Sequence, residues 1–396
     1  MRPPLAHRVS TFGTTIFSEM SRLAAQHHAV NLGQGFPDFD GPQAAKDAAV
    51  AAIQAGENQY AVGSGHPGLR RAIAAHAARF YGQTVDPDAE VTVTAGATEA
   101  LLAALLGLVN PGDEVILFEP YFDCYVPDVR MVGAEPRLVP LRPGPDAAGR
   151  WGFDPDELAA AFNDRTRLIL VNTPHNPTGK VFTAAELSLI ADLCQRWDVL
   201  ALTDEVYEHM VYDGARHVRL ATLPGMAART VTVSSHGKSF SFTGWKVGWS
   251  IAPAALTEAV RRAHQYITFC APAPLQAAAA VSLALDDAFY QALSAEYQRR
   301  RDFLTAALRA AGFRVSAPEG AYYSMADFSP LGFDGDDVAF CRWLTTEIGV
   351  AAIPASAMYS AADQAMARRW ARFAFCKRLE TLEQAAARLA KIRPGR

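Results

Sequence analysis

The chain has few lysines and few cysteines, and it has no long run of apolar residues. Of its 37 basic residues only six are lysine, at positions 46, 180, 238, 246, 377 and 391, and the rest are arginine. Where arginine supplies most of the surface charge, each lysine raises the question of whether its amine is needed chemically. Lys238 and Lys246 lie in one glycine- and serine-rich stretch, so they are the first candidates for a site.

What is scarce also excludes several classes of protein. The five cysteines are scattered and form no CxxC pair, which argues against a disulfide scaffold or zinc cluster and for a reducing compartment. The longest apolar stretches, 100–109 and 271–285, are shorter than the roughly 18 residues of a membrane span. The first ten residues lack the apolar core of a secretion signal. We therefore expect a cytoplasmic protein with no membrane contact and no metal.

Charge and composition indicate a globular enzyme-sized chain. A net charge of −4 over 396 residues gives no basic footprint for nucleic acid. Short β-branched runs alternate with helical patterns through the middle of the chain, which predicts an α/β fold with a mostly parallel sheet flanked by helices. The seven predicted strands are 91–95, 114–118, 136–139, 168–172, 199–203, 230–234 and 247–252, and the predicted helices between or before them are 69–81, 98–109 and 184–196.

The pattern changes after about residue 285. A charged helix is predicted over 296–311, followed by short strands over 322–326 and 372–375 and by helices over 336–348 and 379–391. This indicates a smaller α+β domain. We predict a large domain over 41–285 and a small domain formed by 1–40 and 286–396.

One segment matches the residue pattern of a nucleotide-binding motif but lacks the structural context that the motif requires. Residues 63–68 match GxGxxG, but a dinucleotide site needs a strand directly before the first glycine. The preceding residues, 56–61, are a polar loop. We interpret the motif as a glycine-rich turn before a helix, which disfavours a dehydrogenase.

The ends of four predicted strands carry the chemistry. The first predicted strand is followed by Gly96 and the start of a helix, where free backbone amides suit a phosphate. The others are followed by Asn176 in an Asn-Pro turn, by Asp204 with Tyr207 three residues on, and by Lys238. In an open parallel sheet such ends meet at one crevice. An amine, a carboxylate, a phenol and an anion site together are what pyridoxal phosphate (PLP) requires.

These segments resemble the class I/II aminotransferases of PLP fold type I, closest to the group of kynurenine/glutamine transaminase K, methionine and N-succinyldiaminopimelate aminotransferases. The resemblance covers nearly the whole chain. Its residues are Asn31-Leu-Gly-Gln-Gly-Phe-Pro-Asp, Asn58-Gln-Tyr60, Glu119-Pro-Tyr-Phe-Asp, Asn172-Thr-Pro-His-Asn-Pro-Thr-Gly-Lys, Asp204-Glu-Val-Tyr, Ser235-His-Gly-Lys, Thr243-Gly-Trp-Lys-Val-Gly-Trp and Arg372-Phe-Ala-Phe.

The resemblance implies a role for each matching residue. Lys238 forms the Schiff base with PLP and then carries the proton between the substrate Cα and the cofactor. Asp204 pairs with the ring nitrogen, Asn176 and Tyr207 bind the phenolic oxygen, and Phe122 stacks on the ring. The residues implied to hold the phosphate are Ala97, Thr98, Ser235 and Lys246.

The resemblance also implies a substrate site and a homodimer. Arg372 binds the substrate α-carboxylate, helped by Asn176 and the backbone of Gly33, and Tyr60 reaches the phosphate of a second subunit. Phe269 is expected to line the side-chain pocket from the neighbouring subunit.

The amino acid and the 2-oxo acid stay open. An uncharged, aromatic or sulfur-containing amino acid such as glutamine, methionine or kynurenine is expected. The alternatives are N-succinyl-LL-diaminopimelate aminotransfer, a PLP-dependent C–S β-lyase acting on cysteine conjugates, and a non-catalytic PLP-fold protein, which the presence of Lys238 disfavours.

Overall fold

The computed structural model describes residues 5–10, 12–13, 15–144 and 150–392. Its centre is a seven-stranded sheet in which β8 runs antiparallel to both neighbours and all other neighbouring pairs are parallel. In spatial order the strands are β2 (Val91–Thr94), β8 (Gly248–Ile251), β7 (Thr230–Ser235), β6 (Leu200–Asp204), β5 (Thr166–Asn172), β3 (Glu114–Glu119) and β4 (Glu135–Pro140). The predicted mostly parallel sheet is confirmed, and each strand lies within two residues of its predicted bounds.

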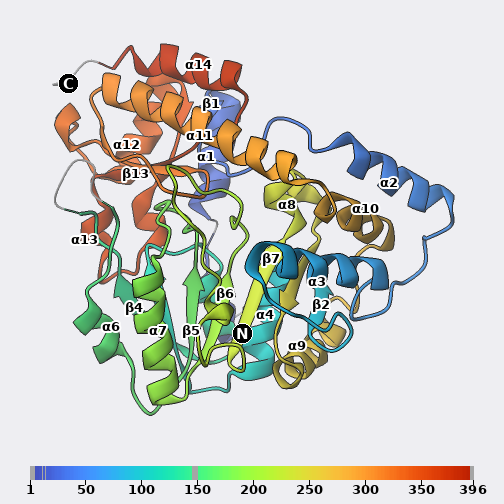
Figure 1. Ribbon diagram of the computed structural model, residues 1–396. Helices are drawn as coiled ribbons and strands as arrows, with labels where there is room; N and C mark the ends of the chain where they lie inside the picture. The colour runs from blue at the N-terminus through green and yellow to red at the C-terminus, as the bar shows by residue number, and fades with distance from the viewer. Residues whose placement is uncertain (1–4, 11, 14, 145–149, 393–396) are drawn as a thin grey trace.

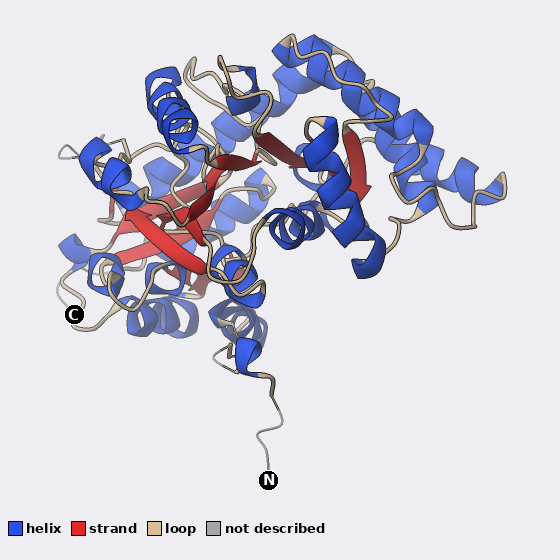
Figure 2. Ribbon diagram, turned by 90° about the horizontal axis from the view of Figure 1, so that it is seen from below, coloured by secondary structure: helices blue, strands red, loops and turns tan. Residues whose placement is uncertain are grey.

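The strands β3, β5 and β6 contain apolar runs because both faces of the sheet are covered there (Figure 2). Along β5, Leu168 and Leu170 point into one core and Ile169 and Val171 into the other, as the two-residue period of a strand requires. The first core is closed by α4 (Ala97–Leu108), α5 (Tyr125–Met131) and α9 (Ala254–Ile267), and the second by α7 (Ala184–Trp197).

The remaining α-helices are distributed along the whole chain. They are α1 (Ile16–Gln26), α2 (Gln43–Gln54), α3 (Pro67–Tyr81), α6 (Pro155–Ala161), α8 (His236–Ser239), α10 (Ala273–Leu283), α11 (Asp287–Ala310), α12 (Asp337–Trp343), α13 (Gln364–Ala367) and α14 (Leu379–Leu389). In Figure 1, α2 and α10 pack together at one side of the molecule. No helix among these described segments is long and apolar enough to cross a bilayer.

A second, smaller sheet lies in the C-terminal part of the chain. It is antiparallel, in the order β12 (Ile353–Pro354), β13 (Trp370–Ala374), β10 (Tyr323–Asp327) and β9 (Arg314–Val315). Nearby, β1 (Val30–Asn31) pairs with β11 (Val350–Ala351), so the N-terminal segment joins this end of the molecule (Figure 1). The expected α+β character is confirmed, while the domain boundaries at 40/41 and 285/286 stay predictions.

Two expectations about helices have clear outcomes. The helix expected over 296–311 begins nine residues earlier, because Asp286 caps it by accepting a hydrogen bond from the Phe289 amide. The GxGxxG segment is a turn as interpreted: residues 57–66 contain no strand, and α3 begins at Pro67.

Candidate active site

A cavity opens at the edge of the sheet where β5, β6 and β7 end. The space between its lining residues, including the part open to solvent, is about 630 Å³. Of the residues predicted to bind a cofactor, nine line this cavity: Ala97, Thr98, Phe122, Asn176, Asp204, Tyr207, Ser235, Lys238 and Lys246. The structure thus brings together side chains that are up to 149 positions apart, from Ala97 to Lys246.

Two predicted residues lie away from the cavity. Tyr60 is 85% exposed and Phe269 is 40% exposed, and their rings meet edge-on with centroids 5.5 Å apart. Within one chain neither ring lines the cavity. Their predicted place, in the site of a neighbouring subunit, stays a prediction.

Lys238 presents its amine to the cavity without a competing partner. It lies in α8, directly after β7, and its Nζ is 5.8 Å from the ring centroid of Tyr207 and 5.7 Å from that of Tyr322. Among the described residues, no side chain or carbonyl is within hydrogen-bonding distance of this Nζ. Burial lowers the pKa of the Lys238 amine, partly offset by Cys376 and Asp204. A lowered pKa favours the neutral form of the amine, which is the form that acts as a nucleophile.

Asp204 supplies a buried carboxyl group opposite the lysine. It ends β6, where Tyr125 donates a hydrogen bond of 2.7 Å to Oδ2 and the amide of Val206 donates one of 3.3 Å to Oδ1. Burial raises the pKa of Asp204, and these two hydrogen bonds act against that rise. Asn172 fixes the segment, because it donates to the Asp204 carbonyl and accepts from the Asn176 amide.

The sequence did not reveal the roles of Tyr125 and Asn172. Asn172 begins one of the segments that carry the family resemblance, but no function was expected of it. Tyr125 is the first residue of α5, three positions after Phe122, which precedes the helix, and both line the cavity. Its position in the same sequence segment as Phe122 is the signal that could have drawn attention to Tyr125.

The opposite end of the cavity is built for an anion. The helix α4 starts at Ala97 and directs its free amides into the cavity. Gly96 has φ +82°, and a Cβ there would lie 3.1 Å from the Nζ of Lys246, so the lysine amine rests directly against this turn. Among the described residues, the hydroxyls of Thr98 and Ser235, which line the same cavity, have no hydrogen-bonding partner.

Arg372 lies beside the cavity as a buried cation with donors to spare. It is only 2% exposed, and its guanidinium donates 3.0 Å to the Asn176 side chain and 2.8 Å to the Gly33 carbonyl. Its Nε is buried with no partner. The guanidinium carbon lies over the rings of Phe17 at 5.1 Å and Tyr323 at 4.2 Å. An incoming carboxylate would satisfy the unused N–H groups.

The unpartnered groups in the cavity fit pyridoxal phosphate. The free amine suits its aldehyde, the buried carboxyl its ring nitrogen, and the anion site its phosphate. A cavity of this composition at the carboxyl edge of a mostly parallel sheet defines a PLP-dependent enzyme of fold type I.

The comparisons with known proteins give the family. The model described as aminotransferase class I and II matches residues 27–389, and the chain belongs to this family of PLP-dependent enzymes. It is therefore a transaminase, as the sequence predicted.

Relatives with different substrates resemble the chain over their whole length. The solved structure of N-succinyldiaminopimelate aminotransferase from Mycobacterium tuberculosis is 48% identical, with a TM-score of 0.95, covering 98% of this chain and 100% of that one. Methionine aminotransferase of Escherichia coli is 41% identical, covering 97% of each chain. Kynurenine–oxoglutarate transaminase of Dictyostelium discoideum is 40% identical, covering 98% of this chain and 96% of the relative.

Proposed function

We propose that the protein transfers the α-amino group of an L-amino acid with an uncharged, aromatic or sulfur-containing side chain, such as glutamine, methionine or kynurenine, to a 2-oxo acid. The observation that supports this is the surroundings of Arg372, to which we assign the substrate α-carboxylate. Beyond its two polar partners, its neighbours are the uncharged Phe17, Tyr323 and Met358. Asp123 interacts electrostatically with Arg372, and burial raises the pKa of its carboxyl while Arg372 lowers it.

The lysine and the aspartate act on the reacting centre. Bound pyridoxal phosphate supplies an aldehyde that links to amines and a ring that accepts electrons from the substrate Cα. Lys238 would hold the cofactor through its amine, and the same amine would take up the substrate Cα proton. Asp204 would hold a proton on the ring nitrogen, and the positive charge there would favour the ionised form of Asp204, against the effect of burial.

The other residues orient the reactants. Asn176 and Tyr207 bind the phenolic oxygen, and Phe122 packs on the ring. Arg372 holds the substrate carboxylate by a bidentate pair while the Gly33 carbonyl and Asn176 keep the guanidinium in place. The phosphate is held by Ala97, Thr98, Ser235 and Lys246.

The active form is a homodimer in this proposal. Tyr60 and Phe269 are exposed apolar side chains next to a surface that also exposes Val62 and Tyr266, and exposed apolar clusters mark interfaces. Each subunit places Tyr60 at the phosphate of the other and Phe269 at its substrate pocket.

A second candidate is N-succinyl-LL-diaminopimelate aminotransferase. It is favoured by the 48% identity and the TM-score of 0.95 to the Mycobacterium tuberculosis enzyme of that name. Its substrate carries additional carboxylates, which need cations beyond Arg372.

A panel of half-reactions separates these candidates. The holoenzyme is mixed with one amino acid at a time, without a 2-oxo acid, and formation of pyridoxamine phosphate is followed by absorbance. We expect glutamine, methionine or kynurenine to react more than about tenfold faster than N-succinyl-LL-diaminopimelate. The reverse order would replace the first candidate by the second.

Two controls complete the panel. Lys238→Ala should form no pyridoxamine phosphate with any amino acid. Release of pyruvate and ammonia from a cysteine conjugate without a 2-oxo acid, faster than any half-reaction, would instead identify a C–S β-lyase.

A further inference from the structure

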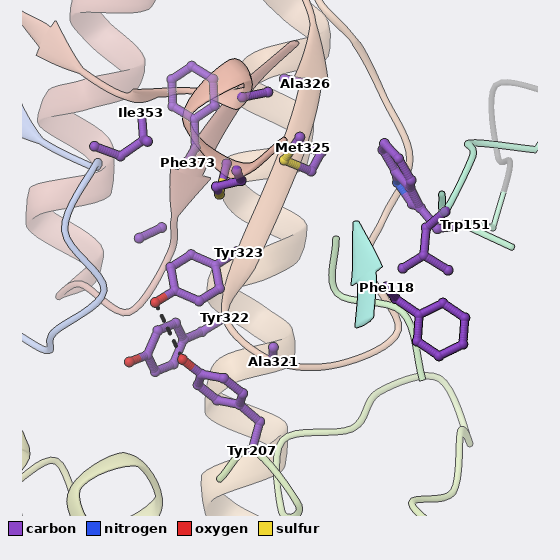
Figure 3. Packing of buried hydrophobic residues seen from close by; sticks show 14 of the residues in the cluster. Phe118, Trp151, Tyr207, Ala321, Tyr322, Tyr323, Met325, Ala326, Ile353 and Phe373 are labelled. Atoms are coloured by element: carbon purple, nitrogen blue, oxygen red, sulfur yellow. Dashed lines mark hydrogen bonds between the residues drawn. The ribbon is translucent and has the colours of Figure 1, made fainter. Parts of the chain in front are cut away.

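Tyr323 lies between Arg372, to which we assign the substrate carboxylate, and Tyr207, to which we assign the phenolic oxygen of the cofactor. It begins β10 and pairs with Ala374 on β13, two residues from Arg372. Its ring lies under the Arg372 guanidinium, with 4.2 Å from the centroid to the guanidinium carbon. Its Oη is 3.4 Å from the Oη of Tyr207. Figure 3 shows the hydroxyls of Tyr207 and Tyr323 pointing toward each other, with the ring of Tyr322 beside them.

The surroundings leave the Tyr323 hydroxyl little freedom. A Cβ at Gly35 would lie 1.8 Å from the Tyr323 Oη, so only glycine leaves room for the hydroxyl. The same Gly35 accepts a 2.6 Å hydrogen bond through its carbonyl from the neighbouring Tyr322. The side chain is 3% exposed, so water does not compete for its hydroxyl. The guanidinium of Arg372 packs on one side of the Tyr323 ring, and Gly35 lies against the Tyr323 hydroxyl.

The number of available protons decides the direction of the hydrogen bond. Tyr207 has one hydroxyl proton, and in the proposed function it donates that proton to the phenolic oxygen of the cofactor. In the structure the Tyr207 hydroxyl donates to the Tyr323 oxygen at 3.4 Å. With the Tyr207 proton engaged by the cofactor, its oxygen has only acceptor capacity left, so this hydrogen bond reverses and the Tyr323 hydroxyl becomes the donor. A hydroxyl that accepts a hydrogen bond becomes a stronger donor, since bonds in a chain polarise one another.

We propose that Tyr323 is a positioning residue that directs the Tyr207 hydroxyl toward the cofactor's phenolic oxygen and ties it to the arginine that binds the substrate carboxylate. The proposal rests on the role assigned to Tyr207 in the proposed function. Tyr323 contacts both Arg372, which binds the substrate in the proposed function, and Tyr207, which binds the cofactor. One side chain therefore lies between the substrate-binding and the cofactor-binding group.

The test is a pH titration of the holoenzyme, read as the midpoint of the bound cofactor's absorbance change. Weaker donation by Tyr207 leaves more negative charge on the phenolic oxygen, which favours the protonated form of the covalent link. Tyr323→Phe should therefore raise the midpoint by roughly 0.3–1 pH unit. Gly35→Ala, which pushes the hydroxyl away without removing it, should shift the midpoint in the same direction.

A double-mutant cycle shows whether Tyr323 acts through Tyr207. Tyr207→Phe alone should raise the midpoint, and adding Tyr323→Phe to it should change nothing further. Tyr297→Phe removes a buried hydroxyl from the same aromatic cluster, since its ring centroid is 5.9 Å from that of Tyr322, and it should leave the midpoint unchanged.

The outcomes are distinguishable. An unchanged midpoint in Tyr323→Phe, or an equal shift in the presence and absence of the Tyr207 hydroxyl, overturns the proposal for Tyr323. If Tyr207→Phe itself leaves the midpoint unchanged, the role of Tyr207 in the proposed function fails instead.

Discussion

Burial moves the protonation of Lys238 and Asp204 in the same direction, toward the neutral form of each. It lowers the pKa of the amine and raises that of the carboxyl. For the amine this is useful at once, because only the neutral form attacks an aldehyde. For the carboxyl it becomes useful on binding, since a protonated ring nitrogen supplies the opposite charge that stabilises the carboxylate.

Tyr125 donates a hydrogen bond to Asp204 that favours its carboxylate form. Substituting Tyr125 tests the importance of this hydrogen bond. Tyr125→Phe deletes the 2.7 Å hydrogen bond to Oδ2, a bond to a charged group once the cofactor is present. We expect cofactor affinity to fall by about tenfold, measured by titrating the cofactor-free protein with pyridoxal phosphate. Tyr121→Phe, in the same segment, is the matched control and should bind normally. Equal affinity in the two variants would contradict the role of Tyr125.

Among individual site residues, the sequence predicted those that directly follow strands. It missed the residues that reach the site only through tertiary packing. Lys238, Asp204 and Asn176 could be placed together because parallel strands end at one edge. Tyr125 reaches Asp204 from α5, a helix 79 positions earlier in the chain, and no local pattern encodes such a contact.

At the scale of the element, the start of α4 is the part of the site that backbone geometry controls most strongly. Gly96 has φ +82° and approaches Lys246, which itself has φ +54°. Glycine adopts such an angle without strain, whereas Lys246, which is not glycine, is strained by its left-handed backbone. The positive φ of Gly96 lets the turn approach the lysine amine closely.

Gly96→Ala should therefore weaken phosphate binding more than it weakens the fold. The new Cβ, 3.1 Å from Nζ, displaces Lys246, and the backbone angle adds about 1–2 kcal/mol of strain. We expect about tenfold weaker binding of pyridoxal phosphate and little change for pyridoxal, which lacks the phosphate.

Gly82→Ala is the matched control for this change. Gly82 also has positive φ, +62°, but nothing lies within 4 Å of its Cβ position and it ends α3 away from the cavity. It should lower thermal stability and leave the affinity ratio of the two ligands unchanged. An equal ratio in all three proteins would show that Lys246 does not bind the phosphate.

Strands were predicted more completely than helices. All seven strands of the main sheet were found, and β3, β5 and β6, which are buried on both faces, give continuous apolar runs. The helices α1 and α9 were not predicted, although both are amphipathic. The helix α10 was not predicted: its alanine-rich sequence shows no amphipathic stripe, and Pro272 and Pro274 suggest a loop. Prolines at the first turn are compatible with a helix, so its existence follows from packing against α2 and α3.

At the scale of the whole molecule, the C-terminal part is tied to the edge of the main sheet beside the cavity. Ser360 donates through its amide to Glu119 at 2.9 Å, and the Tyr121 amide donates to the Met358 carbonyl at 2.9 Å. Burial and the neighbouring Asp363 raise the pKa of Glu119 to about 7. The Ser360 hydrogen bond lowers the pKa of Glu119, but burial and Asp363 outweigh it, so the folded protein as a whole favours the protonated form of Glu119.

This gives a pH dependence of stability with a defined sign. Because the folded state holds the Glu119 proton up to about pH 7, its stabilising contribution is complete below the ordinary pKa of a glutamate and is lost as pH rises toward 7. Relative to Glu119→Gln, the wild-type protein should lose about 1–2 kcal/mol of unfolding free energy between about pH 4.5 and 7, measured by urea denaturation. The exposed Glu383→Gln should show no such difference. A difference that is constant with pH would contradict the assignment.

The strongest test of the whole molecule concerns the proposed sharing of the site between two subunits. If Tyr60 completes the cavity of a second chain, Lys238→Ala in one subunit and Tyr60→Ala in the other fall in the same cavity of a mixed dimer. A hybrid then holds one cavity with both residues intact and one with neither. Random mixing of the two variants should restore about one quarter of the wild-type sites, measured as transaminase activity after refolding or subunit exchange.

The reason lies in where the two residues sit in one chain. Lys238 lines the cavity, whereas Tyr60 is 85% exposed and touches only Phe269 among the aromatic rings of the described residues. Mixing Lys238→Ala with Asp204→Ala is the control, since both residues belong to one cavity of one chain and the hybrid has no intact cavity. Activity restored in the first mixture and absent in the second requires a dimer with Tyr60 crossing between subunits. If neither mixture recovers activity while hybrids are present by mass, Tyr60 does not serve the partner's cavity, and the exposed apolar surface around it has another occupant.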